Sequence, residues 1–146
     1  MDTVRPIELL LVEDNPGDIE LTKKALQRAK VANRLTVAKD GVEAMAILNQ
    51  IDGYADRAEP QLILLDLNLP KKDGREVLAE IKADQRLRRI PVIVLTSSKA
   101  EEDILRTYDL HVNSYITKPV EMEQFVRVVK SIEEFWFQIV RLPPKK

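Results

Sequence analysis

Short apolar segments that alternate with stretches of helical periodicity constrain the fold of this chain most strongly. The clearest is the uninterrupted apolar run at residues 62–65, which is typical of a strand covered on both faces and ends in Asp66. Neighbouring parallel strands need long crossover connections, which are usually helices. We therefore expect a parallel sheet with helices on both faces, a three-layer α/β domain. The predicted strands span residues 7–12, 34–38, 62–66, 91–96 and 112–117.

Apolar residues at helical spacing predict the helices between these strands. The first helix runs from Pro16 to about Lys30 with proline in its first turn, and the last begins near Glu121 and continues beyond Phe135. Residues 52–61 are polar and irregular, which predicts a loop. The other helices are marked by apolar residues at 42, 44, 45, 47, 48 and 51, at 77, 78, 81 and 87 with a start around Gly74, and at 104, 105 and 108.

Length and charge limit the classes of protein to consider. A chain of 146 residues fits one domain over residues 1–146, with a core at about 6–137 and a helix extension and tail at 138–146. No attached output domain is expected. The formal net charge of −1, from 23 basic and 24 acidic residues, removes the bulk electrostatic argument for nucleic-acid binding.

Residue usage excludes several chemistries. The absence of cysteine rules out disulfides, thiolate metal sites and thiol catalysis, and the single histidine, His111, makes a zinc site or a catalytic triad hard to build. The apolar runs fall far short of the roughly 18 residues of a transmembrane helix, and the N-terminus has no apolar signal core. We expect a cytoplasmic protein with no membrane or nucleic-acid partner.

Polar side chains follow four of the predicted strands at their carboxyl ends, where ligands bind in open α/β sheets. Converging carboxylates need a cation between them, and oxygen ligands without His or Cys favour Mg²⁺. A lysine and hydroxyls beside such a cation describe a pocket for a phosphoryl group, with an aspartate as nucleophile. These residues are Glu13 and Asp14, Asp66 and Asn68, Thr96 and Ser97, and Thr117 and Lys118.

Structural roles are open for each of these motifs taken alone. Glu13 and Asp14 form an acid pair of the kind that usually lies in a solvated loop or a helix cap. The segment 96–98 is also typical of the N-cap of a following helix, and Lys118-Pro119 of a surface turn. An acid directly after a buried strand, as at Asp66, needs a partner or a cation.

Taken together, the motifs resemble a response-regulator receiver domain of two-component signalling, over about residues 6–137. The resemblance rests on their order and spacing, and it implies a flavodoxin-like (βα)5 fold with strand order 2-1-3-4-5. The matching motifs are Glu13-Asp14, Leu65-Asp66, Pro70 with Asp73-Gly74, Thr96-Ser97 and Lys118-Pro119.

The resemblance also implies a role for each site residue. Asp66 is similar to the phosphoacceptor, and Lys118 to the lysine that pairs with the phosphoryl oxygens after a cis bond to Pro119. Thr96 resembles the switch hydroxyl, and Tyr115 the aromatic residue that changes rotamer with it. The implied Mg²⁺ ligands are Glu13, directly or through water, Asp14, Asp66 and the backbone carbonyl of Asn68. The implied phosphate contacts are Asn68, Ser97 and Lys118.

In particular, the chain resembles small single-domain regulators that partner bacterial phytochromes, notably in cyanobacteria. The segments 66–75 and 53–60 and the ending Phe135-Trp136-Phe137 carry this similarity. We therefore expect a histidine kinase as partner, and a bacterial phytochrome as that kinase.

The apolar residues of the last predicted helix cover an arc of roughly 200°, wider than one sheet face requires. We interpret Phe135, Trp136 and Phe137 as part of a homodimer surface. This surface is the face formed by the fourth predicted helix (apolar residues 104, 105 and 108), the fifth strand (112–117) and the last, fifth helix. A deeply packed terminal helix is the structural alternative.

The expected activity is a signalling switch that reacts only with itself, gaining and losing a phosphoryl group at Asp66. Asn68 and Ser98 flank the expected water path and would tune the lifetime of the phosphoryl group. A Mg²⁺-dependent aspartyl phosphohydrolase is disfavoured because its general acid, two residues after the nucleophile, is replaced by Asn68. A receiver-like scaffold that works without phosphate is the other alternative, and the intact acid, hydroxyl and lysine set argues against it.

Overall fold

A computed structural model gives the fold, and it describes residues 6–28, 30, 32–51, 53, 58–96, 99–106, 112, 114–118, 123–128 and 130–131. Its strands form one parallel sheet in the order β2-β1-β3-β4-β5, as predicted. The strands are β1 (Ile7–Val12), β2 (Asn33–Ala38), β3 (Leu62–Asp66), β4 (Val92–Thr96) and β5 (Ser114–Thr117). The helices are α1 (Pro16–Arg28), α2 (Gly41–Leu48), α3 (Gly74–Ala83) and α4 (Lys99–Arg106), and residues 123–128 and 130–131 are also helical.

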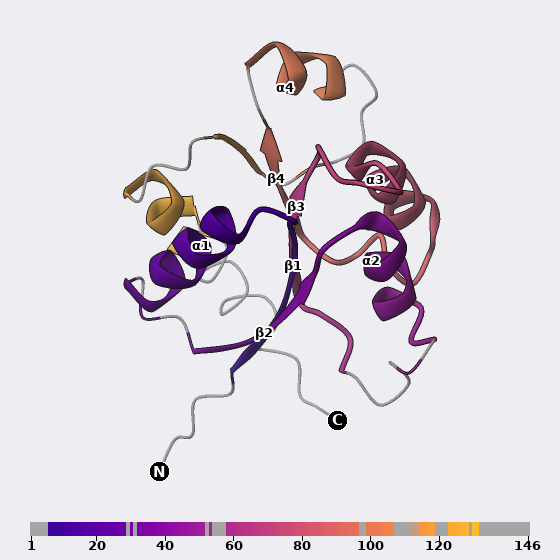
Figure 1. Ribbon diagram of the computed structural model, residues 1–146, viewed down its shortest axis with the longest axis horizontal. Coiled ribbons are helices and arrows are strands. Elements are labelled where there is room, and N and C mark those ends of the chain that lie inside the picture. The colour runs from indigo at the N-terminus through magenta and orange to yellow at the C-terminus, as the bar shows by residue number, and fades with distance from the viewer. Residues whose placement is uncertain are drawn as a thin grey trace.

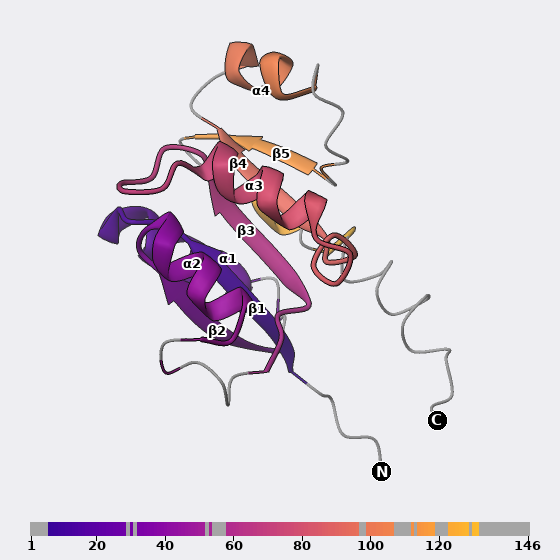
Figure 2. The same cartoon turned by 90° about the vertical axis from the view of Figure 1, so that its right-hand side faces the viewer.

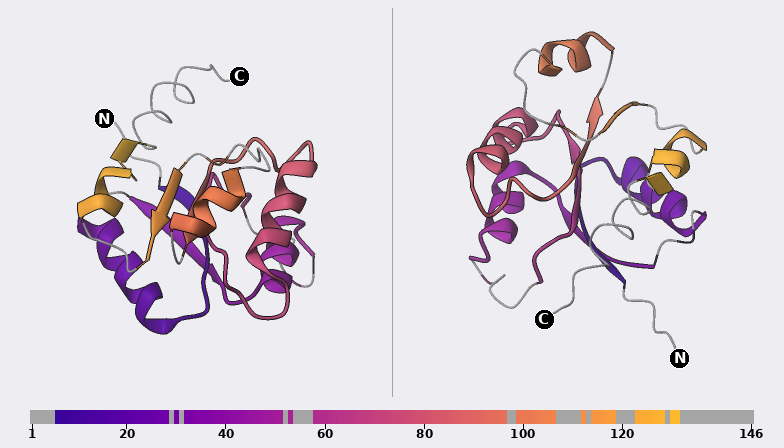
Figure 3. Two further views of the ribbon diagram at one scale, coloured as in Figure 1. Left: turned by 90° about the horizontal axis from the view of Figure 1, so that it is seen from above. Right: turned by 180° about the vertical axis from the view of Figure 1, so that it is seen from behind.

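Helices cover both faces of the sheet, which gives the expected three layers. Helix α1 and the helical residues 123–128 lie on one face, and α2 and α3 lie on the other (Figures 1 and 3). Alternate residues of β1 divide between the two resulting cores: Leu10 and Val12 pack with α2 and α3, whereas Leu9 and Leu11 pack with α1 and Phe125. Burial on both faces explains why the central strands read as continuous apolar runs.

Parallel pairing brings the carboxyl ends of the strands to one edge of the sheet, and Figure 2 shows the strands running in the same direction. Backbone hydrogen bonds extend the pairing one residue beyond three strands. The N–H of Glu13 donates to the Ala38 carbonyl at 2.9 Å, that of Leu67 to Leu95 at 3.2 Å, and that of Lys118 to Thr96 at 2.7 Å. The residues that follow β1, β3 and β5 are therefore fixed at the same edge.

Helix α2 ends earlier than the apolar spacing predicts, and Ile51 is 51% exposed beyond it. Gln50 adopts a left-handed φ of 55°, its N–H donates to the Ile47 carbonyl, and the N–H of Ile51 donates to the Ala46 carbonyl. This pair of bonds is a Schellman ending, which satisfies the last carbonyls and stops the helix.

Helix α3 also ends before one of its predicted residues. Leu87 lies beyond the end of the helix at Ala83, and it is nevertheless fully buried. The Asp84 carboxylate accepts hydrogen bonds from the N–H groups of Arg86 and Leu87, and this turn places Leu87 in the core with α2 and α3. The apolar spacing matched a buried residue but assigned it to the wrong element.

Helix α4 lies beyond the β4–β5 side of the sheet (Figures 1 and 2). Ile104, one of the apolar residues that predicted this helix, is 56% exposed on it. Within the described part of the chain, no helix is long and apolar enough to cross a membrane. Several predicted residues lie outside the described residues: Ser97, Ser98, Tyr108, His111, Pro119 and Phe135-Trp136-Phe137.

Candidate functional site

Three acidic residues, Glu13, Asp14 and Asp66, meet at the carboxyl edge of the sheet, and we call them the acid cluster. One carboxylate oxygen from each lies within 4.8 Å of the others. Glu13 is fully buried and Asp66 is 2% exposed, whereas Asp14 faces solvent. Glu13 is therefore neither a solvated loop residue nor the cap of α1, because the Asn15 side chain accepts the N–H of Asp18 in the capping position.

The Lys118 side chain reaches this acid cluster from the residue after β5. Its Nζ lies 2.9 Å from Glu13 Oε1, 3.3 Å from Asp66 Oδ2 and 2.9 Å from Asp18 Oδ2. The sequence predicted a lysine beside the acids, but it did not predict the contact with Asp18. Asp18 lies in the first turn of α1, and its acidic side chain there is the only signal in the sequence that could have suggested a contact at this edge.

Burial and charge shift two pKa values at this site. Burial of the Glu13 side chain, reinforced by the nearby Asp66 charge, raises the pKa of Glu13 to about 7 although contact with Lys118 lowers it. Burial alone would lower the pKa of Lys118, but the carboxylates of Asp18, Glu13 and Asp66 raise it above its usual value. The lysine therefore stays protonated at neutral pH, and at Glu13 burial opposes the ionisation that Lys118 favours.

The backbone around Asp66 holds its carboxylate in place. The N–H of Asn68 donates to Asp66 Oδ1 at 3.2 Å, while Oδ2 faces Lys118. Helix α3 begins directly against this turn, since the N–H of Gly74 donates to the Leu67 carbonyl at 3.0 Å. A Cβ at Gly74 would lie 2.4 Å from the Asp66 carbonyl oxygen, so only glycine permits this approach.

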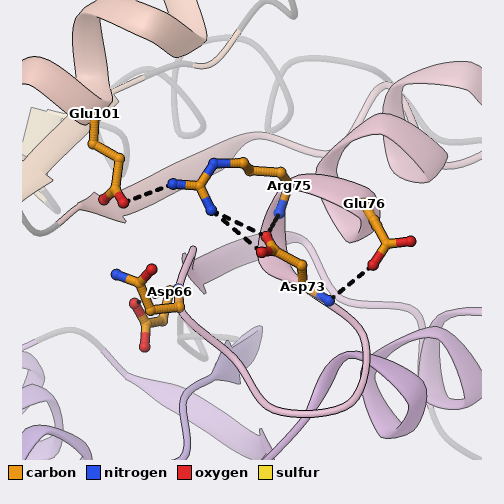
Figure 4. Close-up of polar contacts among 6 residues, drawn as sticks. Asp66, Asp73, Arg75, Glu76 and Glu101 are labelled. Atoms are coloured by element: carbon orange, nitrogen blue, oxygen red, sulfur yellow. Dashed lines mark hydrogen bonds and ion pairs between the residues drawn. The ribbon is translucent and has the colours of Figure 1, made fainter.

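A polar network fixes the start of α3 and links it to α4, as Figure 4 shows beside Asp66. Asp73 caps α3 by accepting the N–H of Arg75 at 2.7 Å, and Glu76 accepts the N–H of Asp73 at 3.1 Å, which completes a capping box. The Arg75 guanidinium contacts the Asp73 carboxylate and Glu101 in the first turn of α4. The sequence predicted Asp73-Gly74 as a motif but gave no signal for Glu101.

Thr96 and Tyr115, the predicted switch residues, lie on the neighbouring strands β4 and β5. Thr96 is fully buried, and its Oγ1 has no hydrogen-bond partner among the described residues. Tyr115 is half-buried and packs against the core on the α2 and α3 side of the sheet. Asn68 is exposed next to Asp66. Thr96, the last residue of β4, and Asn68, two residues after Asp66, thus lie at the carboxyl edge of the sheet, whereas Tyr115 lies within β5 opposite Val94. Ser97 lies outside the described residues.

The chemistry of the cluster suits a hard divalent cation. Its donors are carboxylate oxygens, which Mg²⁺, Mn²⁺ and Ca²⁺ prefer, and burial of Glu13 and Asp66 makes their mutual repulsion expensive without a counter-charge. Lys118 supplies one positive charge to the site. The unpartnered Thr96 hydroxyl further provides a donor for an anionic group bound beside the acids.

Known proteins place this fold and site in a family. The model of the response regulator receiver domain matches residues 9–130. The response regulator Rcp1 of Synechocystis sp. is 49% identical over 138 residues, which cover 94% of each chain. The chain therefore belongs to the response regulator receiver domain family, whose members are signalling domains.

Solved structures agree with this assignment. The phosphorylated cyanobacterial phytochrome response regulator RcpA has a TM-score of 0.77 and 55% identity, with 91% of this chain and 95% of that chain covered. The Mn²⁺-bound form of Rcp1 has a TM-score of 0.77 and 48% identity, with 95% of this chain and 100% of that chain covered. The flavodoxin-like fold and the strand order predicted from the sequence are confirmed.

Proposed function

We propose that this chain is a phosphorylation switch in which Asp66 accepts a phosphoryl group from a histidine kinase. The observation that carries this proposal is the setting of the Asp66 carboxylate at the end of β3. It is 2% exposed, its Oδ1 is held by the N–H of Asn68, and its Oδ2 lies 3.3 Å from the Lys118 ammonium. A fixed carboxylate beside a lysine ammonium, within an acid cluster that suits a divalent cation, is suited to attack phosphorus.

In the proposed step, a carboxylate oxygen of Asp66 attacks the phosphorus of a phosphohistidine in line. The bond between phosphorus and the imidazole nitrogen breaks as the new P–O bond forms, and the imidazole leaves. Lys118 would neutralise charge on the phosphoryl oxygens, and the buried Thr96 hydroxyl would donate to one of them. The 3.3 Å between Lys118 Nζ and Asp66 Oδ2 supports the first role, and the lack of a partner for Thr96 Oγ1 among the described residues supports the second. The only protein group that the chain would modify is its own Asp66, and hydrolysis of the acyl phosphate would regenerate the carboxylate and release inorganic phosphate.

Mg²⁺ is the cation we propose for the acid cluster. Its ligands would be Glu13, directly or through water, Asp14, Asp66 and the backbone carbonyl of Asn68. Bound there, the ion would neutralise charge that develops on the transferred group. The oxygen-only donor set supports this choice, and the Mn²⁺ bound by the relative Rcp1 supports a divalent ion of this type.

Phosphorylation would move Thr96 toward the phosphoryl group, and Tyr115 would change rotamer with it. These two movements would transmit the signal from the site. The two strands that carry these residues are hydrogen-bonded neighbours, with Thr96 opposite Thr117 and Tyr115 opposite Val94. We assign phosphate contacts to Asn68, Ser97 and Lys118, and a role in phosphoryl lifetime to Asn68 and Ser98. The face of α4, β5 and the last helix would then change its partner preference.

A bacterial phytochrome is the histidine kinase that we propose as partner in the cytoplasm. Support comes from RcpA, a phytochrome response regulator that is 55% identical in sequence to this chain over the aligned residues. Phosphotransfer from a purified cyanobacterial phytochrome kinase, compared with transfer from a histidine kinase of another class, tests this. Equal rates from both kinases would remove the phytochrome from the proposal.

We further propose one domain over residues 1–146 that forms a homodimer through the face of α4, β5 and the last helix, with Phe135, Trp136 and Phe137 in the contact. The exposed Ile104 on α4 supports an apolar contact on this face. Truncation after Glu134 should give a monomer in light scattering. An unchanged mass per particle would place the dimer contact elsewhere.

Phosphorylation itself is tested with acetyl phosphate as the donor. Intact mass is measured after incubation with and without Mg²⁺, on the wild type and on Asp66→Asn. We expect a Mg²⁺-dependent gain of one phosphoryl group that the variant lacks. Labelling that persists in Asp66→Asn would refute the assignment of the acceptor. No labelling from either acetyl phosphate or a histidine kinase would favour a phosphate-independent scaffold.

A further inference from the structure

Lys118 is held by a carboxylate that lies outside the acid cluster. Its Nζ is 2.9 Å from Asp18 Oδ2, as close as it is to Glu13 and closer than it is to Asp66 at 3.3 Å. Asp18 comes from the first turn of α1, whereas the acid cluster comes from the ends of β1 and β3. We propose that Asp18 is a positioning residue that holds the Lys118 ammonium at the edge of the acid cluster and so keeps the cluster available to a divalent cation. This inference rests on the proposed function.

Local structure directs the Asp18 carboxylate toward Lys118. The Asn15 side chain caps α1 by accepting the N–H of Asp18 at 3.0 Å. In a reciprocal capping box, an acid in the position of Asp18 would accept the N–H of the cap residue. Here the Asn15 N–H donates to Glu13 Oε2 at 3.2 Å instead, so the Asp18 carboxylate is left for the lysine. The Thr22 hydroxyl, which donates to the Asp18 carbonyl at 2.9 Å, adds a further contact to this turn.

Asp18 and the acid cluster compete for the ammonium of Lys118, and this competition defines the proposed role of Asp18. Lys118 contacts two members of the acid cluster, and a divalent cation bound to those carboxylates would repel it. Among the described residues, Asp18 is the one side-chain contact of Lys118 that neither belongs to the acid cluster nor becomes phosphorylated in the proposed reaction. It can therefore retain the ammonium when the cation binds and when the phosphoryl group forms. Without Asp18, the full charge of Lys118 would fall on Glu13 and Asp66 and compete with the cation.

Binding of Mg²⁺ or Mn²⁺ alone, followed by calorimetry, tests this role without any reaction. We expect Asp18→Asn to weaken cation affinity about fivefold, the order of effect of one partly exposed charge pair. Asp18→Glu should restore affinity to near the wild-type value because it returns the carboxylate. Glu20→Gln is the matched control because it removes one negative charge from the same helix. Among the described residues, Glu20 forms an ion pair only with Lys23.

The route of the effect is tested in a Lys118→Gln background. If Asp18 acts through the lysine, Asp18→Asn should change cation affinity little once Lys118 is gone. If Asp18 attracts the cation directly, the loss should be the same in both backgrounds, and the proposal is overturned. Circular dichroism checks that Lys118→Gln folds; if it does not, the comparison of Asp18→Glu with Asp18→Asn decides, and equal affinities of these two variants overturn the proposal.

Phosphoryl gain from acetyl phosphate, measured on the same variants, separates this inference from the proposed function. A wild type that binds the cation but gains no phosphoryl group would contradict the proposed function and leave the calorimetric test of Asp18 intact. A wild type that gains the group while Asp18→Asn and Glu20→Gln bind the cation equally would overturn only the role of Asp18.

Discussion

The Arg75 Nη2 atom lies 2.6 Å from Glu101 Oε2, and this ion pair joins the start of α3 to the first turn of α4 (Figure 4). The same guanidinium contacts both carboxylate oxygens of Asp73, each at 3.3 Å. Because α3 begins against the backbone of Asp66, the network connects the proposed phosphoacceptor with a helix of the proposed partner face. The ion pair therefore links α4 to the start of α3.

Arg75→Gln should loosen α4 without unfolding the domain. The pair is partly exposed, with side-chain exposures of 40% and 15%, so its loss should cost less than about 1 kcal/mol of unfolding free energy. Amide hydrogens of residues 99–106 should exchange faster with solvent, because the tie to α3 is gone. Hydrogen exchange followed by mass spectrometry on the native protein measures this change.

Lys99→Gln is the control for that experiment, because Lys99 contacts Glu102 and Asp103 within α4 itself. It removes two ion pairs within α4, whose lysine is more exposed at 72%, but leaves the tie to α3 intact. Equal exchange rates at residues 99–106 in Arg75→Gln and in the wild type would contradict the linkage.

Gly74→Ala should destabilise the protein because the added Cβ would lie 2.4 Å from the Asp66 carbonyl oxygen and 2.6 Å from Leu67 Cα. Both contacts are with backbone, so α3 has to move away from the turn, at a cost of about 1–3 kcal/mol. Urea unfolding measures the loss. Gly17→Ala in α1 is the matched control, since its Cβ would meet only the Asn15 side chain, at 3.2 Å. Equal stability of the two variants would show that α3 accommodates the methyl group.

The sequence predicted best those elements in which the order of apolar and polar residues depends only on burial. The limits of β1 and β3 were predicted correctly because Ile7–Val12 is apolar except for Glu8, and Leu62–Asp66 is an apolar run that ends in an acid. The convergence of the acid cluster also followed, because parallel strands bring their carboxyl ends to one edge. Helix ends were predicted less well, since the left-handed turn at Gln50 has no periodic signature.

Contacts between elements distant in the chain were not predictable from residue patterns. Asp18 and Lys118 are 100 positions apart, and their contact depends on the rotation of α1 about its axis. Arg75 and Glu101 depend in the same way on how α3 and α4 lie relative to each other. Spacing within one element specifies which residues share a face, but the meeting of two faces is fixed by packing of the whole domain.

Stability of the metal-free protein should fall as pH rises from about 4.5 to 7 through the titration of Glu13. Its pKa of about 7 in the folded state exceeds its usual value of 4.5, so the folded state binds this proton more tightly than the unfolded chain does. The stabilisation is complete below the lower pKa and is lost as pH rises through the higher one. The unfolding free energy should therefore fall by at most about 1.4 kcal/mol per pH unit.

Urea unfolding in the presence of a chelator, at several pH values between 4.5 and 8, measures that dependence. The matched variant is Glu13→Gln, which keeps the shape of the side chain and does not titrate. The wild type should lose more stability than the variant across this window. Parallel curves for the two proteins would show that Glu13 titrates near its usual pKa.

Thr96→Val should stabilise the unphosphorylated protein, although it removes a residue of the proposed reaction. The Thr96 hydroxyl is fully buried without a hydrogen-bond partner among the described residues, and valine has nearly the same shape. Removing an unsatisfied buried hydroxyl should add about 1 kcal/mol to the unfolding free energy. Urea unfolding measures the gain, and the rate of phosphoryl gain from acetyl phosphate should fall because the proposed donor to the phosphoryl oxygens is lost.

Thr22→Val provides the contrast, because Thr22 is equally buried but its hydroxyl donates to the Asp18 carbonyl at 2.9 Å. This variant should lose about 0.5–1.5 kcal/mol, the usual net contribution of such a bond. A gain of stability at Thr96 together with slower phosphorylation would mean that its hydroxyl is retained for the reaction and not for the fold. Similar losses at both positions would mean that Thr96 is already satisfied in the unphosphorylated protein, which would leave its hydroxyl less available to a phosphoryl group.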